Sequence, residues 1–399
     1  MTPEQLEHLT VFMSLAGSHA YGTNTPESDI DLRGIALEPR SAILGTQPFE
    51  QYESKPTKPT PVFLTRLVEA AELPIVEDEP LDYAIFALRK FVTLAARTNP
   101  NIIEQLFTSE RCILFRDPIL DPLFEIRDAF VSKAARYSFS GYAISQLRRI
   151  RRHKRWLDNP IEKQPQREDY GLPEKHGIPK HQLNAAEALI RKKLDDWTLD
   201  ALDRLDHVDA LAINQRQSRI LKAVFAAGYE VGSGGNKIEQ VDALESDDVM
   251  YRAAVTELGF DSNFMAYLEQ EKRYKRDLRD WQSYQTWKKE RNPVRAKLEK
   301  ESGFDRKHAS HLVRLLRMGV EILETGKINV DRTQIDAEEL SAIRHRGIWT
   351  YEQLVEWAEA QDKKLDELYK TSTLPRSPRW KKINPVLESI MEKSLSRSR

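Results

Sequence analysis

Two carboxylates two residues apart are the first side chains in this sequence that could do chemistry. Asp29 and Asp31 lie within residues 28–37, where apolar and polar residues alternate and predict a strand. Alternate side chains of a strand share a face, so both carboxylates should point the same way while Ile30 and Leu32 point into the core. Two like charges side by side are unfavourable unless a cation lies between them. Since Mg²⁺ is commonly bound by one or two carboxylates together with substrate phosphates, the pair is predicted to hold Mg²⁺.

A glycine and a serine precede this pair. Gly17 and Ser18 follow the apolar run 11–15, which predicts a buried strand that turns into the start of a helix. A glycine lets a phosphate approach the backbone, and the serine adds a hydroxyl and a backbone N–H. The Gly-Ser pair alone and the Asp-x-Asp pair alone are both common in proteins that do not react with nucleotides. Together, on neighbouring strands, they fit attack on the α-phosphate of a nucleotide.

The order of these residues resembles a known signature. A Gly-Ser pair, a short spacer and an Asp-x-Asp are similar to the motif of the DNA polymerase β-type nucleotidyltransferase superfamily. The fuller strings at residues 17–23 and 28–34 resemble one branch of it, the predicted nucleotidyltransferases associated with RNA repair. Segments 82–91 and 99–107 are similar to the same branch. The close likeness covers roughly the first third of the chain.

The resemblance implies transfer of a nucleoside monophosphate from an NTP to a hydroxyl acceptor, with release of pyrophosphate. It also implies two Mg²⁺ ions, with Mn²⁺ as the alternative ion. Asp29, Asp31 and a third carboxylate would hold these ions and serve catalysis, and Asp82 is the candidate by position. The alternative for Asp82 is a strand-entry or capping role. Glu104 is a weaker substitute for it.

Further nucleotide contacts are expected from a helix in the second half of the chain. Lys307, His311 and Arg314 align on one face of it at helical spacing. The resemblance implies helices that close over the catalytic sheet. Together with Gly17 and Ser18, which would cradle the β- and γ-phosphates, these three residues are therefore predicted to bind the nucleotide. The alternative is that they form structural ion pairs.

A histidine pair on the same helix is a weaker candidate for a metal site. His308 and His311 are three residues apart, and only Asp305 lies close enough in sequence to complete a ligand set. Cys112 is the only cysteine in the chain. The chain therefore forms no internal disulfide and no zinc site built on cysteines.

A run of basic residues indicates a polyanionic acceptor. Arg148, Arg152 and Arg155 share one face of a helix predicted over 138–156, and such charges repel one another unless they face an anion. With the resemblance, this face favours an RNA 3′ end such as that of a tRNA-like molecule. The alternative for the face is solvation with partial neutralisation by acidic neighbours. Alternatives for the whole protein are nucleotidylation of a protein or small molecule, and non-catalytic binding of nucleotide or RNA.

Composition and patterning place the chain among α+β proteins. Its 399 residues are 40% apolar and 31% charged with a formal net charge of −1, so any basic footprint must be local. No run has the length of a membrane span and no signal pattern begins the chain, which predicts a cytoplasmic protein without a membrane partner. A small mixed sheet is expected in a catalytic domain at 1–120. A mainly helical domain at 121–370, with a loop or insertion at about 157–180, should close over the active-site cleft, followed by a basic tail at 371–399.

Overall fold

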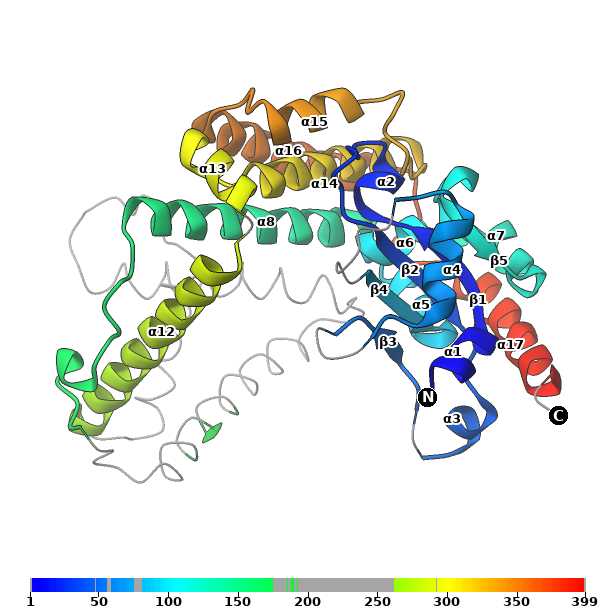
Figure 1. Ribbon diagram of the computed structural model, residues 1–399, viewed down its shortest axis with the longest axis horizontal. Coiled ribbons are helices and arrows are strands. Elements are labelled where there is room, and N and C mark those ends of the chain that lie inside the picture. The colour runs from blue at the N-terminus through cyan, green and yellow to red at the C-terminus, as the bar shows by residue number, and fades with distance from the viewer. Residues whose placement is uncertain are drawn as a thin grey trace. The chain divides into compact units, whose positions relative to one another are not determined.

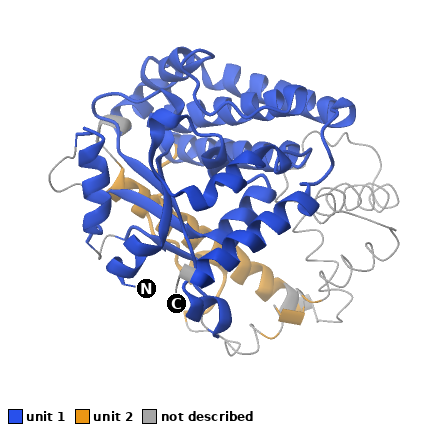
Figure 2. Ribbon diagram, turned by 90° about the vertical axis from the view of Figure 1, so that its right-hand side faces the viewer, with its two compact units in different colours: residues 1–158, 293–399 blue, residues 159–292 orange. Residues whose placement is uncertain are grey.

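The chain forms two compact units. A computed structural model describes residues 2–46, 48–55, 59–74, 81–174, 262–291 and 293–397, together with residues 185, 188, 189 and 192. One unit comprises residues 1–158 and 293–399, and the other comprises residues 159–292 (Figure 2). Amphipathic patterns at 182–196, 198–207 and 214–228 predict helices, which lie outside the described residues except at those four positions. The predicted boundaries near residues 120 and 370 stay predictions.

A five-stranded mixed sheet lies at the centre of the first unit (Figure 1). Its strands are β1 (Thr10–Leu15), β2 (Asp31–Ala36), β3 (Gln51–Glu53), β4 (Asp82–Ala87) and β5 (Ile113–Arg116). Their order is β3-β4-β2-β1-β5, with β2 and β4 parallel and the other neighbours antiparallel. The parallel register pairs Asp31 with Asp82, the first residues of their strands. The predicted α+β fold, a small mixed sheet followed by a mainly helical region, is confirmed.

Both faces of the sheet are covered because its strands are apolar on both sides. Phe12 and Ile35 belong to a large core that includes the helices following the sheet. Met13 and Leu32 belong to a second core on the other face, with side chains from the helices before β1 and after β3. Since successive side chains of a strand alternate in direction, neighbouring residues of β1 contribute side chains to both cores.

Short helices connect the strands. They are α1 (Pro3–Leu9), α2 (Gly17–Tyr21), α3 (Arg40–Leu44), α4 (Val62–Ala70), α5 (Leu88–Ala96), α6 (Pro100–Leu106) and α7 (Asp121–Glu125), with 3-10 turns at Glu110–Cys112, Pro118–Leu120 and Arg127–Ala129. The longer helices of this unit are α8 (Ala135–Asp158), α13 (Pro293–Ser302), α14 (Arg306–Thr325), α15 (Ala337–His345), α16 (Tyr351–Thr371) and α17 (Trp380–Arg397). Within the described part of the chain, none of the helices has both the length and the apolar character that crossing a membrane requires.

Helix α14 is the central helix of this unit and packs against α8, α15 and α16. Asp305 caps its start, because its carboxylate accepts a hydrogen bond from the backbone N–H of His308 at 3.0 Å. Its apolar stripe is buried as predicted, including Leu312, Leu316 and Val320. The first unit is therefore built from segments on both sides of residues 159–292.

Three local predictions differ from the structure. The second strand begins at Asp31 and not at residue 28, so Asp29 precedes the strand. Residues 48–61 are rich in proline, lysine, glutamate and threonine, which predicts a loop, but β3 lies within them and pairs with β4. The composition of the tail predicts one short helix at 386–393, whereas α17 starts at Trp380 and continues past Pro385. Burial of Ile383 and Ile390 in the large core accounts for the longer helix.

In its described residues, the second unit is built around one long helix. Its described elements are α12 (Ser262–Glu290) and the 3-10 turn Arg167–Tyr170. Arg167 donates a hydrogen bond to the buried carboxylate of Glu271, and the Tyr170 hydroxyl donates to Asp277 at 2.8 Å. These contacts hold the turn against the helix.

Candidate active site

The turn after β1 needs a glycine at position 17, because its backbone lies against the side chain of Asp31. Gly17 has a φ of +59°, a conformation that L side chains rarely adopt. A Cβ atom added there would lie 2.2 Å from Oδ2 of Asp31. The preceding backbone N–H, that of Ala16, donates to the Asp31 carbonyl oxygen at 2.8 Å. The Gly17 backbone and the Asp31 carboxylate are therefore held side by side.

The remainder of α2 is fixed by the loop before α15. The backbone N–H of Arg332 donates to the carbonyl oxygen of Tyr21 at 3.1 Å, and Arg111 forms an ion pair with Asp331 at 2.9 Å. Gly22, at a φ of +70°, lies so close to this loop that a Cβ would be 2.2 Å from the Thr333 hydroxyl. The position of the Gly17-Ser18 turn thus depends on residues more than three hundred positions later in the sequence.

Two of the predicted acids are neighbours at the start of parallel strands. Asp82 accepts a hydrogen bond from the Ser54 hydroxyl at 3.1 Å and lies 3.6 Å from the guanidinium of Arg33. Burial raises the pKa of Asp31 to about 6; the nearby Asp82 carboxylate adds to this rise, whereas Arg33 and Lys307 oppose it. Asp29 is exposed just before the strand. The three acids thus differ in environment, because Asp31 is partly buried whereas Asp29 and Asp82 are exposed.

A hollow in the first unit is lined by all five predicted nucleotide-binding residues and by two of the three predicted metal-binding acids, since Asp82 lines neither this hollow nor the next. Its lining includes Gly17, Ser18, Asp29, Asp31, Lys307, His311 and Arg314. A second hollow shares part of this lining and extends toward Arg33, Asn101 and Gln105. Asp31 lines both of them. Residues separated by almost three hundred positions therefore converge on one carboxylate.

Helix α14 supplies the opposite wall through one helical face. Lys307 and His311 are half-buried and line the first hollow. Burial, with the positive charges of Arg314 and Lys307, holds the pKa of His311 well below its usual range. A neutral imidazole near pH 7 can both donate and accept a hydrogen bond. This wall therefore presents an ammonium group and a neutral imidazole.

Arg314 lines both hollows, but its guanidinium is already paired. Its Nη1 lies 2.5 Å from Oε1 of Glu104, and both side chains are buried. The other oxygen of Glu104 accepts a hydrogen bond from the Tyr21 hydroxyl at 2.8 Å, and the guanidinium lies over the Tyr21 ring at 3.7 Å. Arg314 and Glu104 therefore connect α14 and α6 to α2. This geometry favours the structural ion pair that the sequence left open for Arg314.

Sequence reasoning missed some of the lining residues. Ser310 and Arg344 line the first hollow. Ser310 lies three residues after Lys307 and four before Arg314, so the same helical spacing could have found it. Arg344 belongs to a basic segment whose role the sequence left ambiguous, and only the fold places it at the hollow.

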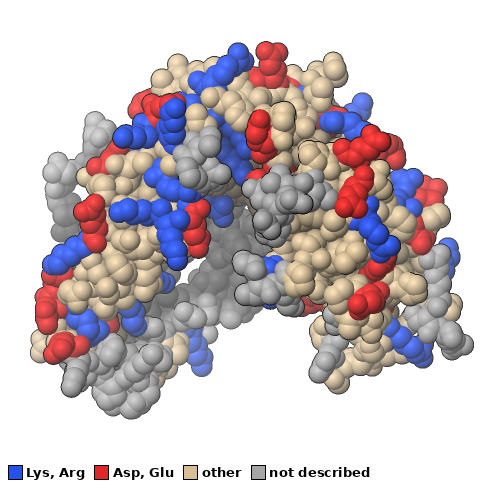
Figure 3. Space-filling view, viewed as in Figure 1, with Lys and Arg blue, Asp and Glu red and all other residues tan. Residues whose placement is uncertain are grey.

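The predicted RNA-binding arginines lie elsewhere on the first unit. Arg148, Arg152 and Arg155 are exposed on α8, and none of them lines either hollow. The guanidinium of Arg152 lies 5.1 Å from the ring of Trp156, and Lys154 pairs with Asp158 at 3.1 Å. Acidic side chains lie among the basic ones on the face drawn in Figure 3. The structure thus leaves both interpretations of this surface open.

Comparison with known proteins identifies the N-terminal part of the chain. Residues 2–159 match the model of a family described as the RNA repair pathway DNA polymerase beta family. The chain is also 31% identical over 109 residues to an uncharacterized 38.9 kDa protein from the nrdC–mobD intergenic region of Enterobacteria phage T4. That alignment covers 27% of this chain and 28% of the phage protein. No solved structure matches the chain.

Proposed function

Since residues 2–159 match the RNA repair pathway DNA polymerase beta family, we propose that the protein transfers a nucleoside monophosphate from an NTP to the 3′ hydroxyl of a tRNA-like RNA. The observation that carries this proposal is the convergence of the Gly17-Ser18 turn, Asp31 and the Lys307–His311 face of α14 on one hollow. A phosphate-binding turn, acids and a cation at one place are what nucleotidyl transfer requires. The acceptor oxygen would bond to the α-phosphorus as the bond to pyrophosphate breaks.

The acids fit divalent metal ions. Asp31 and Asp82 start neighbouring parallel strands, and their mutual repulsion contributes to the raised pKa of Asp31, a strain that a cation between them would relieve. With Asp29 at the exposed rim, the site offers three carboxylates for two Mg²⁺ ions, or for Mn²⁺. When bound, these ions would orient the triphosphate and lower the pKa of the acceptor hydroxyl.

The remaining residues would bind and orient the triphosphate. The Gly17 backbone and the Ser18 hydroxyl would contact the β- and γ-phosphates. Lys307 and Arg344, which line the same hollow, would offset the negative charge that develops on the leaving pyrophosphate. Neutral His311 would donate a hydrogen bond without adding charge. Arg314 would hold α2 in place through Glu104, so its contribution to nucleotide binding would be indirect.

The exposed arginines of α8 would bind the RNA backbone. Arg148, Arg152 and Arg155 lie on α8, which packs against α14, the helix that supplies one wall of the hollow. Contacts to phosphates position an RNA without reading its sequence. This assignment predicts binding that weakens steeply as salt concentration rises.

The test is incubation with each α-labelled NTP and Mg²⁺, with and without total cellular RNA, followed by a denaturing gel. Label in RNA from one NTP supports the proposal and names the nucleotide. The Asp31→Asn variant should give no label, whereas Asp128→Asn, which changes an exposed acid outside the site, should match the wild type. Label on protein alone would instead support protein nucleotidylation. NTP binding without any transfer would support a non-catalytic binding role.

A further inference from the structure

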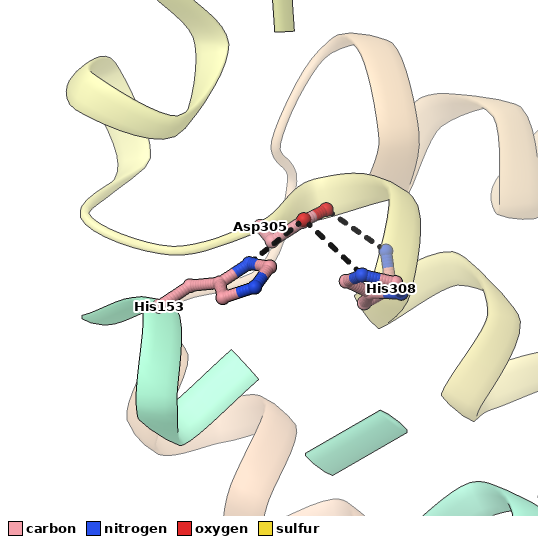
Figure 4. A group of neighbouring side chains, drawn as sticks. All are labelled: His153, Asp305 and His308. Carbon is pink, nitrogen blue, oxygen red and sulfur yellow. Dashed lines mark hydrogen bonds and ion pairs between the residues drawn. The ribbon is translucent and has the colours of Figure 1, made fainter. Parts of the chain in front are cut away.

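Two imidazoles and a carboxylate meet at the start of α14, beside the proposed active site. They are His153 of α8, Asp305 at the cap of α14 and His308 in the first turn of α14 (Figure 4). Asp305 Oδ2 lies 3.4 Å from Nδ1 of His153 and 3.5 Å from Nε2 of His308. One ligand atom from each of the three residues lies within 4.8 Å of the others, and Asp305 is fully buried.

These distances match those between the ligands of a tetrahedral zinc ion. Zinc binds imidazole nitrogen and carboxylate oxygen at about 2.0–2.2 Å, so two ligands at the tetrahedral angle lie about 3.3–3.5 Å apart. The observed 3.4 Å and 3.5 Å fall in this range. Ordinary N–H···O hydrogen bonds are shorter, at about 2.7–3.2 Å. These two spacings therefore fit ligands of a common ion better than a direct hydrogen bond.

A glutamine orients one imidazole as a zinc ligand requires. Nδ1 of His308 lies 2.7 Å from Oε1 of Gln146. Because a carboxamide oxygen only accepts hydrogen bonds, Nδ1 carries the proton and the Nε2 lone pair of a neutral His308 faces the Asp305 carboxylate. Because this lone pair and the carboxylate are both hydrogen-bond acceptors, a cation is needed between them. A hydrogen bond from the second nitrogen of a ligating imidazole to a fixed acceptor is a regular feature of metal sites.

We propose that His153, Asp305 and His308 bind a Zn²⁺ ion that fastens the first turn of α14 to α8. Imidazole ligands suit zinc, whereas Mg²⁺ prefers oxygen ligands, so this site is chemically distinct from the acids of the sheet. The side chain of His308 is 14% exposed. A water molecule would therefore reach the ion and complete its coordination. The ion would hold the neighbouring Lys307 and His311 in place. The proposal rests on these residues alone and does not depend on the proposed transferase activity.

The test uses the full chain, expressed without a histidine tag and stripped of metal with EDTA. Titration with Co²⁺ should give the strong visible absorption of a tetrahedral complex, saturating at one equivalent and abolished by one equivalent of Zn²⁺. Asp305→Asn keeps a capping oxygen for α14 but removes the anionic ligand, so Zn²⁺ affinity should fall by at least about 100-fold. The matched control is His345→Gln, an exposed histidine on α15, which should bind like the wild type.

A second variant separates metal binding from folding. Gln146→Leu keeps all three ligands and removes only the hydrogen bond that orients His308, so the affinity should fall by about 10–100-fold in a folded protein. This variant carries the test if Asp305→Asn does not fold. Absence of the tetrahedral Co²⁺ spectrum in the wild type overturns the proposal. In that case a protonated imidazole, and not a metal ion, supplies the positive charge beside the Asp305 carboxylate. Equal affinity in the wild type and Gln146→Leu overturns it as well.

Discussion

Removing Glu104 should destabilise the first unit because it leaves the guanidinium of Arg314 buried without its anion. Glu104 is 5% exposed and Arg314 is 4% exposed, and their charged atoms are 2.5 Å apart. Breaking a buried pair by removing one partner costs about 3–5 kcal/mol, since the remaining charge is neither solvated nor paired. Loss of the hydrogen bond from Tyr21 adds about 1 kcal/mol. We therefore expect Glu104→Leu to lower the free energy of unfolding by about 4–6 kcal/mol.

The assay is a double-mutant cycle in urea, followed by far-ultraviolet circular dichroism. Combining Glu104→Leu with Arg314→Met replaces the pair by apolar side chains, which in other proteins is often neutral or stabilising. The double variant should therefore regain at least half of the stability that the single variant loses. Glu7→Leu, which breaks the exposed Glu7–Arg66 pair, is the matched control and should change stability by less than about 1 kcal/mol.

Two results would refute this reasoning. A loss below about 1 kcal/mol in Glu104→Leu would show that the pair is solvated, and equal instability of the single and double variants would show that the charge is not the cause. The double variant also separates the two roles of Arg314. If the residue acts only through Glu104 and α2, NTP affinity should fall by less than about tenfold, because no direct phosphate contact worth about 1.4 kcal/mol is lost. A larger loss in a folded double variant would place Arg314 on the nucleotide.

Three further predictions follow from the site. Because the pKa of Asp31 is raised, the metal-free wild type should lose stability relative to Asp31→Asn as pH rises from about 4 to about 6, measured as the difference between their urea midpoints; a constant difference would contradict the raised pKa. Gly17→Ala should abolish transfer and cost about 1–2 kcal/mol because its Cβ meets Asp31 at a positive φ, whereas Gly141→Ala, with open space in α8, should stabilise by up to about 1 kcal/mol in thermal unfolding. Arg152→Gln should reduce the slope of log K against log salt for RNA binding by about 0.7, and an unchanged slope would remove α8 from the RNA interface.

Local patterns in the sequence predicted the burial and the elements around the acids well. The alternation around Asp29 and Asp31 correctly buried Ile30 and Leu32, at 8% and 0% exposure, because strand periodicity is set by the backbone. The pattern over 82–97 likewise predicts a strand that passes into a helix, and β4 ends at Ala87 where α5 begins at Leu88. Such features depend on neighbouring residues and are therefore readable from the chain.

Features that depend on contacts between residues far apart in the sequence could not be predicted from local patterns. The sequence placed His308 beside Asp305 but could not supply His153, which approaches only because α8 packs on α14. It recognised Glu104 as an acid near the site, yet its partner Arg314 is 210 positions away. The short β3 was missed because its residues lie among prolines and charges, and pairing with β4 overrides that composition.

The division of the site between two parts of the chain limits what the family match explains. The match ends at residue 159 and contains the Gly17-Ser18 turn and all three acids, but Lys307 and His311 lie outside it. These two residues enter the hollow on a helix that follows the whole second unit and returns to pack against α8. The acids would hold a metal ion by themselves, whereas the positive charges and the neutral imidazole opposite them come from α14 and α15. The family match therefore bears on the part of the chain that carries the acids, and we expect the α14 face to set the choice of nucleotide and the response to the zinc ion proposed at the start of α14.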